Sequence, residues 1–271
     1  IFEETAKGFL VCASREELGE RTIFVKYNRT RKEAFRIRTS ICEGEGGLWV
    51  EKRALSLAGE GHIQSMERKY EQLKRTNPGV SVLAPQYGAA GAENQSGSGG
   101  KNAGEQEHLS VRFAFVKGRT LADVLAEELR EAAAGRGETG APAGQKLCPW
   151  KVQIEAALDR VLGKAEKTAE GFQPTEGFKE VFGETVPLKD ASYAVSNVDG
   201  LFENIMETED GLVCLDYEWV FDFPIPAGFI KYRLLFYFYR AHAGLLEGLG
   251  CASQEEFLKE FGIGKDLAAV Y

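Results

Sequence analysis

The N-terminal part of the chain alternates apolar and polar positions in the way that β-strands do. Residues 22–27 and 33–41 both show this alternation, and they flank a polar turn at residues 28–31. A second turn at residues 43–47 leads into residues 48–52, which continue the same pattern. We therefore predict an antiparallel hairpin with a third strand beside it.

Further along, the spacing of apolar residues changes to that of α-helices. In residues 56–75 they recur at intervals of three and four, which predicts an amphipathic helix that ends near the Asn-Pro-Gly sequence at 77–79. Residues 108–116 return to strand character, and residues 120–134 and 152–162 again have helical periodicity.

Two segments are too rich in small and polar residues to bury apolar surface. Residues 89–107 are predicted to be a flexible insertion, and residues 134–145 a loop. The rest of the chain is predicted to be mostly helical, apart from a short hairpin between residues 204 and 216. The expected fold class is α+β. It has an N-terminal lobe of a small antiparallel sheet plus one helix (1–116) and a mainly helical C-terminal lobe (117–271).

Composition excludes several classes of protein. Of 271 residues, 44% are hydrophobic and 27% charged, which is ordinary globular usage rather than that of a disordered or fibrous chain. The net charge of −8 argues against a wide basic surface, so we expect no nucleic-acid partner. The five cysteines form no C-x-x-C pair, which favours reduced thiols over a disulfide framework or a zinc site.

Neither a membrane span nor a leader sequence is predicted. The longest apolar stretch, residues 229–246, is interrupted by a lysine, two arginines and a histidine, which is typical of a buried helix rather than a transmembrane one. No signal-peptide pattern is present, so a cytoplasmic location is expected. Because the sequence opens with Ile1 rather than Met, we expect a piece of a longer polypeptide, fused to further domains.

The segment from Asn197 to Trp219 carries the most chemical information. It contains Asp199 and Asn204 in the spacing D-x4-N, and then a strand, a turn and a strand that ends in Asp216. Phosphoryl transfer from ATP needs a carboxylate beside the acceptor hydroxyl and oxygen ligands for Mg²⁺. A short loop would place Asp199 and Asn204 on one side of the site, and the hairpin would bring Asp216 to the opposite side. The spacing D-x4-N alone is also common in ordinary turns. The interpretation therefore depends on whether the other residues that a kinase needs occur in the right order along the chain.

These residues resemble the protein-kinase-like superfamily, in particular its aminoglycoside phosphotransferase and choline kinase branch, whose pattern is roughly H-x-D-x4-N followed by I-D-[WFY]-E. The resemblance implies a two-lobed kinase-like fold with Asp199 as catalytic base and Asn204 and Asp216 as ligands of Mg²⁺, with ATP as phosphate donor. Glu218 matches the acid at the end of the pattern. Asn197 stands where the family has histidine, which weakens a protein-kinase assignment more than a kinase assignment.

The same resemblance extends upstream. The strand that ends in Lys52 resembles the strand whose lysine grips the α- and β-phosphates. Glu67, on the following helix, is the candidate ion-pair partner of Lys52, although Glu60 or Glu71 could take that role. A solvated strand lysine and a helix-surface acid are the alternative interpretation. No G-x-G-x-x-G occurs near the first strands, which is the largest departure from protein kinases.

Residues 113–121 resemble the hinge between the two lobes, where an apolar strand ends in a glycine and a helix begins. The resemblance implies that the backbone of Ala114, Phe115 and Val116 would hydrogen-bond adenine. A plain strand-to-helix turn would have the same residues, so this segment adds little specificity.

A closer likeness is to kinase-like domains of bacterial surface-polysaccharide proteins, such as the bifunctional kinase/methyltransferase that caps O-antigen chains. Residues 172–183, 197–204 and 216–226 carry it, and it would span residues 22–247 without the low-complexity insertions. It implies a small-molecule or glycan acceptor, with the hydroxyl of a sugar at a glycan end as the group that is phosphorylated.

The sequence therefore predicts a kinase that depends on ATP and Mg²⁺ and phosphorylates a hydroxyl. A pseudokinase that binds or scaffolds beside another catalytic domain is the alternative, because the glycine-rich loop is missing and Asn197 replaces histidine. Against it, all three oxygen donors and Lys52 are present. Protein kinase activity is disfavoured because no A-P-E segment follows Asp216, and no G-x-S-x-G sequence supports a hydrolase.

Overall fold

The computed structural model describes residues 19–87, 108–134 and 149–271. The predicted insertion at 89–107 and, apart from residue 134, the predicted loop at 134–145 lie outside the described residues.

The chain divides into two compact units. The first takes residues up to 63 together with 86–115, and the second takes residues 64–85 and 116–271. The segment 64–85, which the sequence analysis placed in the N-terminal lobe, is therefore grouped with the second unit.

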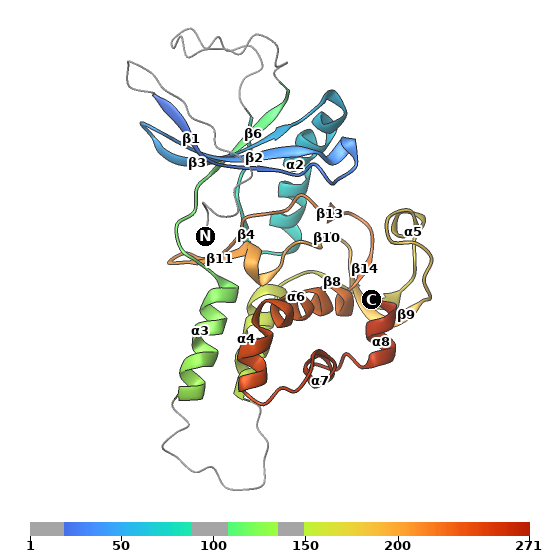
Figure 1. Ribbon diagram of the computed structural model, residues 1–271. Helices are drawn as coiled ribbons and strands as arrows, with labels where there is room; N and C mark the ends of the chain where they lie inside the picture. The colour runs from blue at the N-terminus through green and yellow to red at the C-terminus, as the bar shows by residue number, and fades with distance from the viewer. Residues whose placement is uncertain (1–18, 88–107, 135–148) are drawn as a thin grey trace, which may run out of the picture. The chain divides into compact units, whose positions relative to one another are not determined.

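The first unit is built on a five-stranded antiparallel sheet, whose blue-to-green arrows can be followed in Figure 1. The strands lie in the order β1-β2-β3-β6-β5, with bounds β1 (Glu20–Tyr27), β2 (Ile37–Gly44), β3 (Gly47–Ala54), β6 (Ser110–Ala114) and β5 (Gln86–Tyr87).

One element of this sheet begins later than predicted. The strand expected from residue 33 is preceded by a 3₁₀ turn, η1 (Glu33–Phe35), and β2 starts only at Ile37. The turn allows the ring of Phe35 to pack edge-on against buried His62, with ring centroids 5.3 Å apart. Tertiary packing of one aromatic side chain thus overrides the local alternation.

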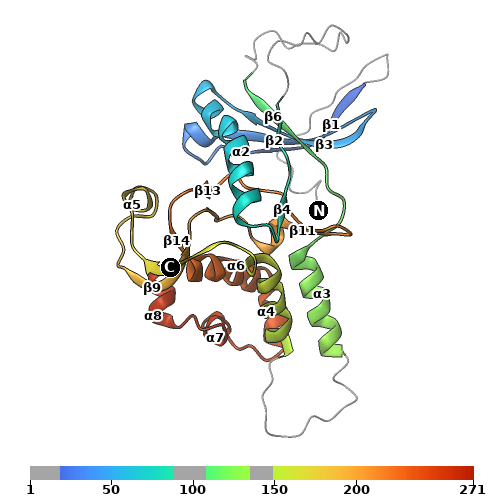
Figure 2. The same cartoon turned by 180° about the vertical axis from the view of Figure 1, so that it is seen from behind.

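Helix α2 (Leu57–Thr76) agrees with the helix predicted for residues 56–75. Its first turns belong to the first unit and its remainder to the second. The second unit also contains the predicted helices α3 (Leu121–Ala134) and α4 (Pro149–Leu162), which lie side by side in Figures 1 and 2.

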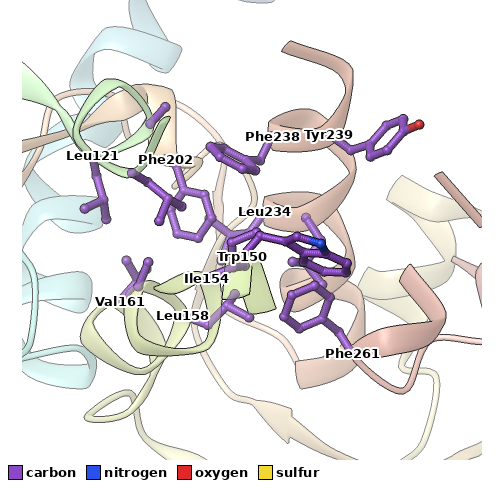
Figure 3. Close-up of a cluster of buried hydrophobic side chains, with 14 of the residues drawn as sticks. Leu121, Trp150, Ile154, Leu158, Val161, Phe202, Leu234, Phe238, Tyr239 and Phe261 are labelled. Carbon is purple, nitrogen blue, oxygen red and sulfur yellow. The ribbon is translucent and has the colours of Figure 1, made fainter. Parts of the chain in front are cut away.

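The core of the second unit is packed between these helices and the long helix α6 (Ala227–Gly248). Figure 3 shows Trp150 of α4 and Phe238 of α6 among the side chains of this cluster, together with Phe202. All three are at most 2% exposed, so each contributes a large apolar surface to stability. Among the described helices, none is long and apolar enough to cross a membrane. The apolar stretch at 229–246 is instead the buried helix α6, as predicted.

Two small sheets position the segment that carries the D-x4-N spacing. The hairpin predicted between residues 204 and 216 is present as β11 and β12, joined by a turn at residues 209–210, and Gly211, the first residue of β12, has a positive φ of 120°. It belongs to a sheet of order β4-β12-β11-β7, and a separate pair joins β10 to β13. The bounds are β4 (Ser81–Val82), β7 (Arg119–Thr120), β10 (Ser196–Asn197), β11 (Ile205–Thr208), β12 (Gly211–Cys214) and β13 (Val220–Phe221).

The prediction of mostly helix in the remaining chain is wrong for the β10–β13 pair and for a larger sheet. A three-stranded antiparallel sheet, in the order β14-β9-β8, is formed by β8 (Lys167–Phe172), β9 (Leu188–Tyr193) and β14 (Ile225–Pro226). It packs through Phe172 and Tyr193 against a smaller apolar cluster that includes Ile230. The short helices of this part are α5 (Glu176–Phe182), α7 (Gln254–Glu260) and α8 (Lys265–Val270).

With this addition, the predicted fold class is confirmed: the chain is α+β, with an N-terminal antiparallel sheet and helix and a mainly helical second unit. The described cysteines, Cys42, Cys214 and Cys251, are buried free thiols, as expected.

Candidate active site

The loop that carries Asp199 is a tight turn between β10 and the 3₁₀ turn η3 (Phe202–Asn204). The Gly200 amide donates a hydrogen bond to the carbonyl oxygen of Asn197 at 3.2 Å. A side chain at position 200 would place its Cβ only 3.3 Å from that oxygen, so the glycine allows the turn to close. Phe202 is fully buried and anchors the far side of the loop in the core.

Asn197 joins this loop to the strand end that carries Asp216. Its Nδ2 donates to the backbone oxygen of Asp216 at 2.8 Å, and its Oδ1 accepts from the backbone amide of Asp199 at 3.1 Å. The thiol of Cys214 also donates to the Asp216 oxygen, at 3.2 Å. One neutral side chain therefore holds the backbones of both candidate acids. This is a structural task that does not require the ionisable histidine of the family pattern.

Asn204 is fixed to the same loop. Its Nδ2 donates to the backbone oxygen of Asp199 at 2.8 Å, and its own backbone oxygen accepts from the amide of Leu215 at 2.8 Å. The carboxamide is thus oriented by its nitrogen, so the side-chain oxygen is the atom suited to ligate a metal. These contacts link the backbones of Asp199 and Asp216 and the side chain of Asn204, and the roles of the three residues stay predictions.

The segment after Asp216 is held by the second half of α2. Lys69, only 6% exposed, donates from Nζ to the backbone oxygen of Glu218 at 2.5 Å, and Glu218 is itself 2% exposed. The amide of Glu218 donates to Oδ1 of Asp216 at 3.3 Å. Arg68 forms an ion pair with Asp222 further along. The strand end that would hold the metal is therefore tied to a long helix.

Arg233, on α6, is a residue of this site that the sequence analysis missed. Its Nε donates to the backbone oxygen of Val198 at 2.7 Å, and its Nη2 lies 3.2 Å from Oδ1 of Asp199. The available signal was one of the cations that interrupt the apolar stretch of residues 229–246. In the sequence alone, these cations indicated only that the stretch does not cross a membrane.

Lys52 lies on β3 in the first unit, opposite Thr39 on β2 and Val111 on β6, and is 6% exposed. The alternative of a solvated strand lysine is therefore wrong, because the side chain is buried. The neighbouring carboxylate of Glu51 is bound by Arg53 and Arg38. Burial alone would raise the pKa of Glu51, but the hydrogen bonds and charges of the two arginines outweigh it and lower that pKa.

The partner of Lys52 stays a prediction. Glu67 is exposed on the part of α2 that belongs to the second unit, and so is Glu71. The carboxylate of Glu60 accepts from the Leu109 amide at 3.2 Å and lies 3.4 Å from a ring nitrogen of His108. Glu60 therefore already has a role in fastening the start of β6 to α2.

The predicted adenine-binding segment lies at the end of β6. Ala114 is the last residue of the strand and pairs with Trp49, so Phe115 and Val116 lie beyond this ladder. Their contact with adenine stays a prediction.

Among the described residues, no three His, Cys, Asp or Glu side chains gather into a metal-binding cluster. The predicted ligands of Mg²⁺, Asn204 and Asp216, are an amide and one carboxylate and do not make up a cluster of this kind, so they stay a prediction.

No protein-family model and no curated protein sequence match this chain. Among solved structures, the apoenzyme of the macrolide 2'-phosphotransferase MphH from Brachybacterium faecium is similar at 14% sequence identity and a TM-score of 0.32. The match covers 90% of this chain and 80% of that chain. It is a distant match to a phosphotransferase. The residue roles proposed below rest on the contacts described above and not on this match.

Proposed function

We propose that this protein transfers the γ-phosphoryl group of ATP to a hydroxyl, with Mg²⁺ as the metal. The proposal is supported by the hydrogen bonds through which the side chain of Asn197 links the backbones of Asp199 and Asp216, while the side chain of Asn204 binds the backbone oxygen of Asp199. If the Asp199 loop served only as a turn, it would not need the side chain of Asn197 to link it to the segment that carries Asp216.

The residues fit the proposed metal and nucleotide. Asn204 and Asp216 would hold Mg²⁺ through side-chain oxygens, which are the donors that this hard cation prefers. When bound, Mg²⁺ would neutralise charge that develops on the phosphate oxygens. The ammonium group of buried Lys52 would contact the α- and β-phosphates, and the backbone of Ala114, Phe115 and Val116 would contact adenine.

Asp199 has the central role in the proposed step. Its carboxylate would orient the acceptor hydroxyl and accept its proton. The acceptor oxygen forms a new bond to the γ-phosphorus while the bond from that phosphorus to the bridging oxygen breaks, and ADP leaves. Asn197 and Arg233 would keep the carboxylate in place during this step.

The acceptor is proposed more specifically as a sugar or the hydroxyl at a glycan end. This part rests on the sequence resemblance alone, so a screen of acceptors tests it independently of ATP turnover.

A comparison of three variants tests the proposed function. Purified protein is incubated with Mg²⁺ and γ-labelled ATP, with water or a panel of hexoses as acceptor. Asp216→Ala and Asp199→Asn should each lower turnover about 100- to 1,000-fold, because each removes a group needed in the transition state. Asp210→Ala is the matched control: it removes an exposed acid from the turn between β11 and β12, and should keep turnover.

Thermal unfolding with and without MgATP separates the alternatives. A nucleotide at about 100 times its Kd stabilises the folded protein by about 2.7 kcal/mol. Stabilisation without turnover in the parent protein would identify a pseudokinase. The absence of both stabilisation and turnover would refute the proposed function.

A further inference from the structure

Arg233 makes two different contacts with the loop of Asp199. Nε donates to the backbone oxygen of Val198 at 2.7 Å, and Nη2 lies 3.2 Å from Oδ1 of Asp199. One planar group thus fixes both the backbone just before the acid and the carboxylate itself. The rigid fork of a guanidinium suits such two-point contact, which an ammonium group cannot reproduce.

The orientation of Arg233 is itself restrained by its own helix. Its guanidinium carbon lies 5.9 Å from the ring centroid of Phe229 and 5.2 Å from that of Tyr237, one turn before and one turn after it on α6. The side chains of Arg233 and Asp199 are only 22% and 27% exposed. Their contact is therefore less screened by water than that of a surface ion pair.

We infer that Arg233 is a positioning residue for Asp199: it holds the carboxylate and the loop backbone in the orientation that proton acceptance from the acceptor hydroxyl needs. This inference rests on the proposed function. It does not make Arg233 a phosphate ligand, because its two contacts are with the acid and its backbone. It also gives a reason for a cation within the apolar helix α6.

A purely structural ion pair would have a different signature. It would lower stability and change all kinetic constants together, and a lysine that restored the charge pair and the stability would restore turnover as well. A positioning role predicts a loss confined to kcat. A displacement of about 1 Å at a reacting group can lower the rate about 100-fold while substrate binding elsewhere is unchanged.

The test uses the whole chain with MgATP, with water as acceptor, and the variants Arg233→Gln, Arg233→Lys and Arg240→Gln. Arg240 is the matched control, because it lies on the same helix and its guanidinium stacks on Phe236 at 5.7 Å. We expect Arg233→Gln to lower kcat about 100-fold with the KM for ATP within about threefold of the parent. Arg233→Lys should have an intermediate kcat, and Arg240→Gln that of the parent.

Two results would overturn the inference while leaving the proposed function intact. One is an active parent protein in which Arg233→Gln and Arg240→Gln have the same kcat. The other is a fall in kcat in Arg233→Gln that is matched by an equal rise in KM and a lower melting temperature, all of which recover in Arg233→Lys. If the parent protein has no turnover with MgATP, the proposed function fails, and this inference fails with it.

Discussion

The substitution Asn197→Ala tests whether one amide holds the two halves of the site together. It removes the hydrogen bonds from Nδ2 to the Asp216 oxygen, at 2.8 Å, and from the Asp199 amide to Oδ1, at 3.1 Å. Each such bond contributes about 1 kcal/mol net. The Asp216 oxygen keeps the thiol of Cys214 as a donor, whereas the Asp199 amide loses this acceptor. We therefore expect the free energy of unfolding to fall by about 2 kcal/mol.

A second substitution separates the hydrogen bond that the Asn197 side chain donates from the one that it accepts. In Asn197→Asp the side chain can still accept from the Asp199 amide but can no longer donate to the Asp216 oxygen. It also adds a negative charge close to the carboxylate of Asp199. Stability should therefore fall at least as far as in Asn197→Ala, and turnover should fall with it, because like charges repel in a partly buried site.

Urea unfolding followed by tryptophan fluorescence measures these changes. In a Trp49→Phe background the remaining tryptophans, Trp150 and Trp219, both lie in the second unit and report only on it. Asn77→Ala is the control. It removes one hydrogen bond of the same unit, from Nδ2 to the Val161 oxygen at 3.2 Å, and should cost about half as much without affecting turnover. If Asn197→Ala unfolds within about 0.5 kcal/mol of its parent and keeps full turnover, the linking role is wrong.

Two further predictions concern the fold of each unit. Phe202→Ala should destabilise the second unit by about 3–5 kcal/mol in the same urea assay, because Phe202 is fully buried against Phe238. Phe182→Ala, at a site that is 38% exposed, should lower the free energy of unfolding much less. Equal losses in the two variants would contradict this account of the core. In the first unit the native pKa of Glu51 lies below its ordinary value of 4.5, so Glu51 stabilises the fold above that pH, and this contribution is lost as the pH falls through the lower native pKa. Melting temperatures measured from about pH 7 to 3 should therefore fall less steeply in Glu51→Gln than in the parent, and parallel curves would show that the carboxylate does not contribute.

Much of the fold could be predicted because its elements are strongly periodic. Helices α2, α3 and α4 follow three-and-four spacing closely, and most of their large apolar residues are buried. The strands of the first unit alternate in sequence, but β1 is exposed along its whole length, including Ile23, Phe24 and Tyr27. The sheet of β8 and β9 could not be predicted, because the sequence of β8, KTAEGF, shows almost no alternation and its pairing with β9 is irregular. Residues 167–172 form a strand because they pair with a segment distant in sequence and because Phe172 is buried in an apolar cluster.

The candidate site was predictable only in part, for a similar reason. Spacing along the chain was enough to propose Asp199, Asn204 and Asp216 as candidates, because the D-x4-N loop and the following hairpin are local structures. Arg233 is 34 residues from Asp199 in sequence, and its contact depends on how α6 packs against the loop. The task of Asn197 likewise became visible only when its two backbone partners were known.

The division of the chain limits how it can be dissected by truncation. Strand β4 pairs in parallel with β12, yet it precedes the last strand of the first unit in sequence. A fragment that stopped at residue 116 would retain β4 and the end of α2 but lose the strand and the acidic segment to which they bind. The complementary fragment would expose the edge of β12, an unpaired strand edge of the kind that promotes aggregation. Expression of either half alone would therefore test solubility rather than function, and the two halves should be produced together.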